Sequence, residues 1–171
     1  ALNRLVIATN PLKTAQKTAY DLSGNISSVE NALGAVTKYE YNGTGKPVQT
    51  IDGEGNIYKM SYDSNGNNTE IIAPDGSKTA MTYDGNQRLV KNVLASGLET
   101  NYEYDSLNRI AKETNNAGQS TKYEYDKAGN VISMTDSKDR KTAYEYDVTG
   151  NLTKVTAFDG NITSYQYDKM G

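Results

Sequence analysis

The chain contains no cysteine, no histidine and no tryptophan, and it has a single phenylalanine. Without cysteine there can be no disulfide bond, no thiolate nucleophile and no zinc site built on sulfur. Without histidine the chain lacks the side chain that most often serves as general base and as transition-metal ligand. We therefore expect neither an enzyme nor a bound metal or cofactor.

Aliphatic side chains are also scarce. Leucine, isoleucine, valine and phenylalanine together make up 29 of 171 residues, below the roughly 20% under which disorder becomes the first suspicion. No apolar run approaches the roughly 20 residues needed to cross a bilayer. The net charge is only −3, with both signs interspersed, so no field would steer nucleic acid or anionic lipid to the chain. We expect neither nucleic acid binding nor membrane insertion.

Tyrosine replaces the missing aliphatic residues. The chain has 14 tyrosines, which together with many threonines favour β-strands over disorder. One tyrosine recurs every 21 residues, and the next residue is aspartate in seven of eight copies and Asn42 in the other. This register comprises Tyr20, Tyr41, Tyr62, Tyr83, Tyr104, Tyr125, Tyr146 and Tyr167. The aspartates that follow are Asp21, Asp63, Asp84, Asp105, Asp126, Asp147 and Asp168. A fixed period of this length indicates a repeat protein of about eight units.

The residues before each repeated tyrosine alternate with period two. Thr121, Tyr123 and Tyr125 are separated by the charged residues Lys122 and Glu124. Period two is typical of a strand with unlike faces. The sequence thus predicts one face that packs through tyrosine and one that meets water.

Two turns with the pattern Asx-x-x-Gly divide each repeat. The Asx side chain caps backbone N–H groups of a type I turn, and glycine takes the left-handed conformation that closes the hairpin. The glycines after Tyr-Asp are Gly24, Gly66, Gly129 and Gly150. The glycines of the second turn are Gly34, Gly55, Gly76, Gly97, Gly118 and Gly160, with Asp139 in the remaining slot. Each repeat is therefore predicted to be a β-hairpin.

Two copies lack glycine after Tyr-Asp. Asn108 is the substitution best able to tolerate a positive φ. Gln87 is not, so we expect a different tight turn there, through Asp84 and Gly85.

The second strand of each hairpin is harder to interpret. Its apolar residues are three apart, as in Val131 and Met134, and this spacing does not keep one face of a regular strand. We expect a bulge or an irregular strand start, and the pattern leaves the facing of this strand open.

Short, similar connections favour antiparallel pairing of successive strands. The predicted fold is all-β: tandem 21-residue β-hairpins forming a continuous antiparallel coiled sheet of about sixteen strands, an open segment of a β-shell or β-solenoid. We expect residues 1–171 to form a single repeat array. Because residues 1–5 and 167–171 fall inside a unit, we expect a fragment of a longer protein whose unpaired edge strands allow self-association.

The motifs resemble a known family. Residues 125–130 read Tyr-Asp-Lys-Ala-Gly-Asn, and residues 142–147 read Thr-Ala-Tyr-Glu-Tyr-Asp. This pattern, present along the whole chain, is similar to the YD-repeat or Rhs-repeat family. That family includes bacterial Rhs and wall-associated polymorphic toxins, the C components of insecticidal toxin complexes, and teneurins.

The resemblance implies a hollow β-shell that encloses a C-terminal toxin, or in teneurins a barrel on an adhesion receptor. It also implies a parent protein that is secreted or delivered to the cell surface. The self-cleavage motif of the family, Asp-Pro-x-Gly, is not in this sequence. The family's autoproteolysis therefore cannot be assigned to residues of this chain.

Other patterns have alternative interpretations. Asp52 with Glu54, or Asp136 with Asp139, could be catalytic or calcium-binding pairs, but turn positions explain their aspartates. The glycine-rich residues 42–46 resemble a phosphate loop, but no helix pattern follows, so a hairpin turn is favoured.

Three functions remain open from the sequence. The first is a structural wall segment whose partners are the rest of its own parent chain, namely further repeats and an enclosed passenger. The second is a module that binds glycan or a cell surface through its tyrosines, although packing explains these rings without a ligand. The third, an enzyme, has no histidine, no cysteine and no non-repeating acidic cluster to support it.

Overall fold

The computed structural model describes residues 6–9 and 15–168, which contain sixteen strands in two compact units. The first unit extends to Arg88, and the second begins at Leu89. In the first unit the strands are β1 (Ile7–Thr9), β2 (Ala15–Tyr20), β3 (Ile26–Glu30), β4 (Val36–Tyr41), β5 (Pro47–Ile51), β6 (Ile57–Tyr62), β7 (Asn68–Ile72) and β8 (Lys78–Tyr83). In the second they are β9 (Leu89–Val93), β10 (Glu99–Tyr104), β11 (Ile110–Asn115), β12 (Ser120–Tyr125), β13 (Val131–Asp136), β14 (Lys141–Tyr146), β15 (Leu152–Thr156) and β16 (Ile162–Ser164).

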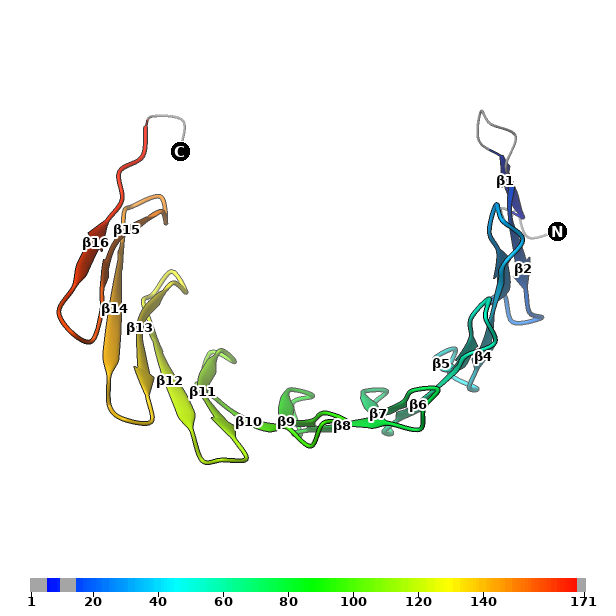
Figure 1. Ribbon diagram of the computed structural model, residues 1–171, viewed down its shortest axis with the longest axis horizontal. Helices are drawn as coiled ribbons and strands as arrows, with labels where there is room; N and C mark the ends of the chain where they lie inside the picture. The colour runs from blue at the N-terminus through cyan, green and yellow to red at the C-terminus, as the bar shows by residue number, and fades with distance from the viewer. Residues whose placement is uncertain (1–5, 10–14, 169–171) are drawn as a thin grey trace. The chain divides into compact units, whose positions relative to one another are not determined.

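Within each unit every strand pairs antiparallel with its neighbours in the chain (Figure 1). The predicted all-β fold of antiparallel hairpin repeats is therefore confirmed. No helix long and apolar enough to span a membrane occurs among the residues that the structure describes.

Two kinds of strand pair alternate along each unit. The pair β11–β12 has three residue pairs, which end at Lys112 and Lys122. The pair β12–β13 is longer and contains a register shift between Glu124 and Tyr125. Equivalent shifts precede the repeated tyrosine in β2–β3, β4–β5, β6–β7, β10–β11 and β14–β15. The predicted bulge is thus confirmed and recurs in both units.

The bulge assigns the facing that the sequence left open. Tyr125 lies opposite Val131, and Tyr123 lies opposite Met134. Because Ile132 is the extra residue between them, apolar residues three apart return to the same face of the sheet. We call this side the tyrosine face, since it carries the alternating tyrosines together with the apolar residues of the second strand.

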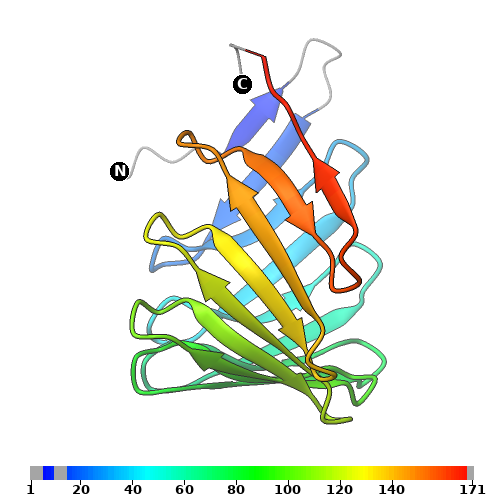
Figure 2. The ribbon, with the colours of Figure 1, turned by 90° about the vertical axis from the view of Figure 1, so that its left-hand side faces the viewer.

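The hairpins close with the predicted turns, which lie at the two ends of the strands (Figure 2). In residues 126–129 the N–H of Gly129 donates to the carbonyl oxygen of Asp126 at 3.3 Å, and Gly129 has a φ of 95°. Asn108 and Asp139 occupy the same left-handed position with φ of 63° and 57°.

The expectation of a different turn at Asp84 is wrong. The N–H of Gln87 donates to the carbonyl oxygen of Asp84 at 2.9 Å, and Gln87 has a φ of 63°. The turn is therefore the same as in the other repeats, with Gly85 in an ordinary position inside it. The hydrogen bonds of the hairpin fix the backbone, and the glutamine tolerates the strain that this conformation imposes.

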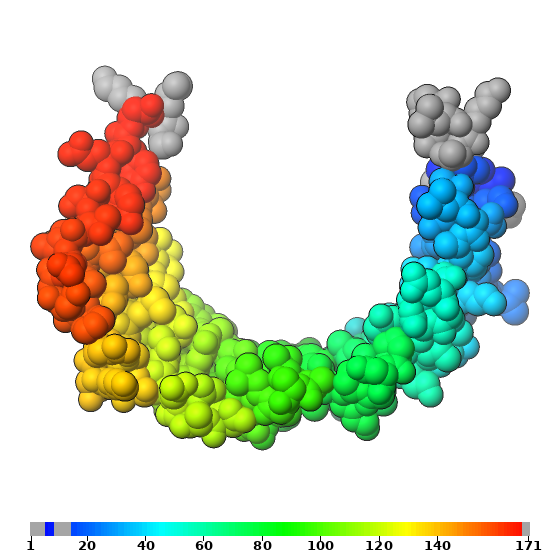
Figure 3. All heavy atoms as spheres, in the orientation of Figure 1, coloured from blue at the N-terminus to red at the C-terminus, as the bar shows by residue number. Residues whose placement is uncertain are grey.

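The sheet of each unit has no second layer in the described part of the chain (Figure 3). No apolar side chain is buried there, and the most buried residue is Ser133 at 2% exposure. The tyrosines are mostly half-buried by their neighbours along the sheet. Side chains in this fold therefore pack against neighbours in the same sheet and not against a second layer.

Replacing Gln87 by glycine tests the strain at this turn. Glycine adopts a positive φ without the Cβ clash, so we expect Gln87→Gly to raise the free energy of unfolding by about 1 kcal/mol. Gly129→Ala is the matched control, because an added Cβ there meets no atom within 4 Å and the cost is purely torsional. Denaturant titration should show a higher free energy of unfolding for Gln87→Gly and a lower one for Gly129→Ala. A lower free energy of unfolding in Gln87→Gly would contradict backbone strain at this position.

Candidate functional site

The candidate site is the repeated Tyr-Asp element, which lies where every second strand ends and its turn begins. Its tyrosine is the last residue of β2, β4, β6, β8, β10, β12 and β14, and Tyr167 follows β16. Its aspartate or Asn42 begins the turn, and Gly24, Gly66, Gly129 and Gly150 take its left-handed position. The glycines of the second turn, Gly34, Gly55, Gly76, Gly97, Gly118 and Gly160, have the same conformation at the other end of the strands.

Each turn carboxylate has two separate sets of partners. Oδ1 of Asp105 accepts hydrogen bonds from the N–H groups of Leu107 and Arg109 at 2.8 and 3.0 Å. Oδ2 of Asp105 accepts from Nε of Arg109 at 2.7 Å. In the next repeat Nδ2 of Asn130 takes this second role toward Asp126 at 2.9 Å. The residue after the turn glycine therefore binds the side chain of the aspartate that begins the turn.

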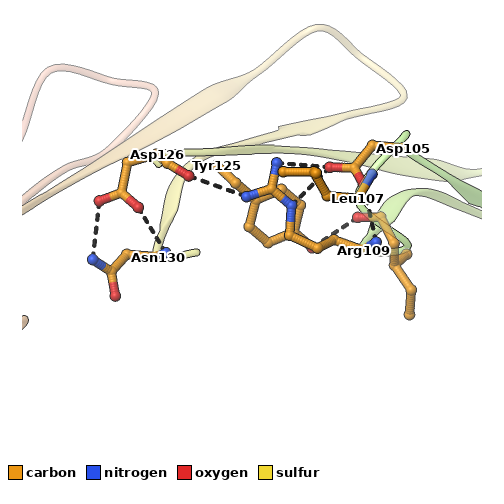
Figure 4. Close-up of polar contacts among 7 residues, drawn as sticks. Asp105, Leu107, Arg109, Tyr125, Asp126 and Asn130 are labelled. Atoms are coloured by element: carbon orange, nitrogen blue, oxygen red, sulfur yellow. Dashed lines mark hydrogen bonds and ion pairs between the residues drawn. The ribbon is translucent and has the colours of Figure 1, made fainter. Parts of the chain in front are cut away.

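Arg109 also reaches the following repeat (Figure 4). Its Nη1 donates to the carbonyl oxygen of Asp126 at 3.0 Å, and its guanidinium lies 4.4 Å from the ring centre of Tyr125. Lys46 takes the equivalent place in the first unit, with Nζ 5.7 Å from the ring centre of Tyr62. The cation at this turn position thus joins one Tyr-Asp element to the next.

The hydroxyl of the repeated tyrosine reaches back across the sheet. Tyr125 donates to the carbonyl oxygen of Ile110 at 2.7 Å, beyond the last residue pair of the short β11–β12 ladder. We call this bond the tyrosine clasp. It joins Tyr41 to Ile26, Tyr62 to Pro47, Tyr104 to Leu89, Tyr125 to Ile110, Tyr146 to Val131 and Tyr167 to Leu152. The clasp extends each short strand pair by one hydrogen bond.

Tyr83 departs from this arrangement. Its hydroxyl donates to Sδ of Met81 at 3.8 Å. A thioether is a weak acceptor, so this repeat lacks the bond that its neighbours have.

The opposite face of the sheet carries ion pairs. In the second unit Lys112 binds Glu103 at 2.9 Å and Lys154 binds Glu145 at 2.8 Å. Oγ of Ser133 donates to Oε2 of Glu124 at 2.6 Å. Exposed pairs of this kind contribute little to stability, but they make this face strongly polar.

Each acidic pair considered as catalytic or metal-binding contains one aspartate that caps a turn. Oδ1 of Asp52 accepts from the N–H groups of Glu54 and Asn56, each at 2.9 Å. Oδ1 of Asp136 accepts from the N–H of Lys138 at 2.8 Å. Within residues 6–9 and 15–168 no group of three or more acidic side chains could hold a metal ion. The glycine-rich residues 42–46 form a hairpin turn, in which Gly45 has a φ of 77°.

Sequence reasoning missed three parts of this element. It omitted Gly45 from the turn register, although the 21-residue spacing includes that position. It gave no role to the residue after the turn glycine, although asparagine, arginine or lysine follows in every described copy. It also missed the clasp, because its acceptor is a backbone carbonyl 15 residues earlier.

The turn hydrogen bonds lower the pKa of the aspartates. The hydroxyl of Thr149 and then the N–H of Asn151 hold the pKa of Asp147 at about 2, against an ordinary value of 3.8. The side chain and backbone of Arg140 lower the pKa of Asp136 to about 2. On the tyrosine face, burial and then the charge of Glu113 raise the pKa of Tyr123.

Comparison with protein families gives two matches. The RHS Repeat model matches residues 104–141, 125–162 and 146–171. The Teneurin YD-shell model matches residues 4–79. A comparison with curated proteins finds no match to this sequence.

Toxin complexes are among the solved structures with a similar fold. The crystal structure of TcdB2-TccC3-Cdc42 has 18% sequence identity and a TM-score of 0.72, over 84% of this chain and 9% of that chain. The Photorhabdus luminescens Tc holotoxin pore has 17% identity and a TM-score of 0.60, over 88% of this chain and 11% of that chain. At this identity the likeness concerns the fold, and this chain spans only a small part of the matched chains.

Removing one hydroxyl tests the tyrosine clasp. We expect Tyr125→Phe to lower the free energy of unfolding by about 0.5–1.5 kcal/mol, because the carbonyl of Ile110 loses its donor while the ring remains. Tyr83→Phe is the matched control and should change stability by less than about 0.5 kcal/mol, since this hydroxyl reaches no carbonyl. Denaturant titration followed by circular dichroism measures both. Equal losses in the two variants would show that the clasp has no special role.

The aspartate turns predict a loss of stability in acid. Because the folded pKa of Asp147 and Asp136 is depressed, their contribution is complete above the ordinary pKa of 3.8 and disappears as the pH falls through about 2. Denaturant midpoints measured across this range should fall steadily toward low pH. Asp147→Asn should flatten part of the profile, because an asparagine still caps the turn, as Asn42 does. A profile that is flat below the ordinary pKa of aspartate would refute this account.

Proposed function

Because this chain belongs to the YD-repeat or Rhs-repeat family, we propose that it is a wall segment of a secreted, toxin-type protein and that the wall encloses a passenger. The observation that carries the proposal is the single-layer sheet with two unlike faces. An uncovered tyrosine face on one side and a face of ion pairs on the other are what a partition between an interior and solvent requires.

The tyrosine face supports contact with an interior passenger. Its rings are only half-buried by their neighbours, so considerable aromatic surface remains for another protein. Tyr58, Tyr165 and Tyr167 are 38%, 42% and 46% exposed. Burial of such surface against a passenger would add to the stability of both partners.

The opposite face supports contact with solvent. The carboxylate side chains of Glu103, Glu124 and Glu145 are 61–66% exposed although each is paired with a lysine. Burying these pairs in an interface would cost desolvation energy that their attraction does not fully return. We therefore place this face on the outside of the wall.

The similar structures support a larger parent protein. This chain corresponds to 9–11% of toxin-complex chains that share its fold. Its partners are then further repeats of its own parent, and the location of the parent is outside the cell or at its surface. In this proposal the segment is structural and contributes no catalytic group.

Chemical labelling of the full-length parent tests the proposal. Nitration should reach Tyr102, Tyr123 and Tyr144 weakly in the intact protein and strongly in a version from which the passenger is deleted. Acetylation of Lys112 and Lys154 on the opposite face should be equal in both and serves as the internal control. Tyrosines that react equally with and without the passenger would overturn the enclosure.

Glycan binding is the alternative, and one feature favours it. A hollow of about 480 Å³ on the tyrosine face is lined by hydroxyl and amide side chains, among them Thr100, Asn115, Gln119 and Thr121, together with the charged side chains of Glu113, Asp136, Lys138 and Arg140. Such groups can form hydrogen bonds with sugar hydroxyls. The same labelling experiment separates the two functions: protection that requires added cell-wall polysaccharide, and not the passenger, would favour the glycan module.

A further inference from the structure

One strand pair of the first unit differs from its counterparts. The β7–β8 ladder has three residue pairs and ends, toward the Tyr-Asp turn, at Glu70 and Ala80. Other short ladders of this kind gain a tyrosine clasp beyond that end, as in β5–β6, where Tyr62 donates to the carbonyl oxygen of Pro47 at 2.8 Å. In β7–β8 the hydroxyl of Tyr83 turns to Sδ of Met81 instead. This end of the pair is therefore held by fewer hydrogen bonds.

Asn68 adds a second weakness at the same place. Asparagine stands where the other repeats have an apolar residue opposite the tyrosine. Those residues are Ile26, Pro47, Leu89, Ile110, Val131 and Leu152. Oδ1 of Asn68 is shielded from solvent and has no hydrogen-bond partner. An acceptor in this state is destabilising in the closed sheet and regains water when the strands separate.

We propose that the β7–β8 joint is the point at which the first unit opens locally, beginning at the end nearest the turn at Asp84. The strands separate at Glu70 and Ala80, Asn68 binds water, and the rest of the unit stays paired. This inference depends on the contacts of the repeat alone and not on the proposed wall function. We call this more weakly held strand pair, β7–β8, the seam.

Hydrogen exchange on the intact chain tests the seam. Amides of the β7–β8 ladder should exchange about two- to tenfold faster than those of β5–β6, the range expected for the loss of one hydrogen bond. Asn68→Ile restores the residue type of the other repeats and should slow this exchange toward the β5–β6 rate. Ile110→Asn is the matched variant and should speed exchange at β11–β12. Equal protection of the two ladders in the unaltered chain would overturn the proposal.

A comparison within the second unit separates the clasp from the buried amide. Asn92 also has a shielded Oδ1 without a partner, but in its strand pair Tyr104 keeps the clasp to Leu89 at 2.7 Å. Slow exchange at β9–β10 would support the missing clasp as the cause of opening. Exchange at β9–β10 as fast as at β7–β8 would refute the role of the clasp.

Discussion

A sheet of one layer has no interior, so every contact that holds it must run sideways to a neighbouring strand. In the described part of this chain no apolar side chain is buried, and the usual source of stability in a domain is correspondingly weak. The repeat compensates at the strand ends where each Tyr-Asp turn lies. There the aspartate closes its own hairpin, and in most described copies the tyrosine hydroxyl binds the previous strand. Where the residue that ends the turn is a cation, as at Lys46 and Arg109, it also stacks on the next tyrosine. These local interactions stabilise the sheet in place of a hydrophobic core.

The bulge and the clasp occupy adjacent positions in the repeat. The extra residue Ile132 returns Met134 to the face of Tyr123, and the next strand pair, β13–β14, ends at Ser133 and Ala143, just after this bulge. A short strand pair then leaves a carbonyl beyond its last rung, which a tyrosine hydroxyl can reach. The long side chain of tyrosine supplies both ring surface and donor, and this explains why the repeat uses tyrosine where phenylalanine would pack equally well.

Sequence reasoning predicted what depends on contacts within one turn or one strand. The 21-residue period, the capped turns and the left-handed residues at Asn108 and Asp139 follow from the chemistry of four or five adjacent residues. It failed at Gln87, because the paired strands impose a backbone conformation that the residue alone disfavours. It could not assign the facing of the second strand, since facing depends on which residue is left unpaired opposite Tyr125. The partners of Arg109 were out of reach for the same reason, because they belong to the next repeat.

The tyrosine clasp also affects which changes in the length of the repeat array the fold tolerates. Each tyrosine that forms a clasp binds a carbonyl 15 residues earlier, as Tyr125 does. This separation is shorter than one repeat, so the contact does not depend on how many units precede or follow it. Gene duplication or loss of a whole unit would leave each surviving clasp with its acceptor, whereas an insertion within β11 or β12 would shift the register of this strand pair and misplace one. A change of length by whole units therefore preserves these hydrogen bonds, whereas a change by part of a unit disrupts at least one.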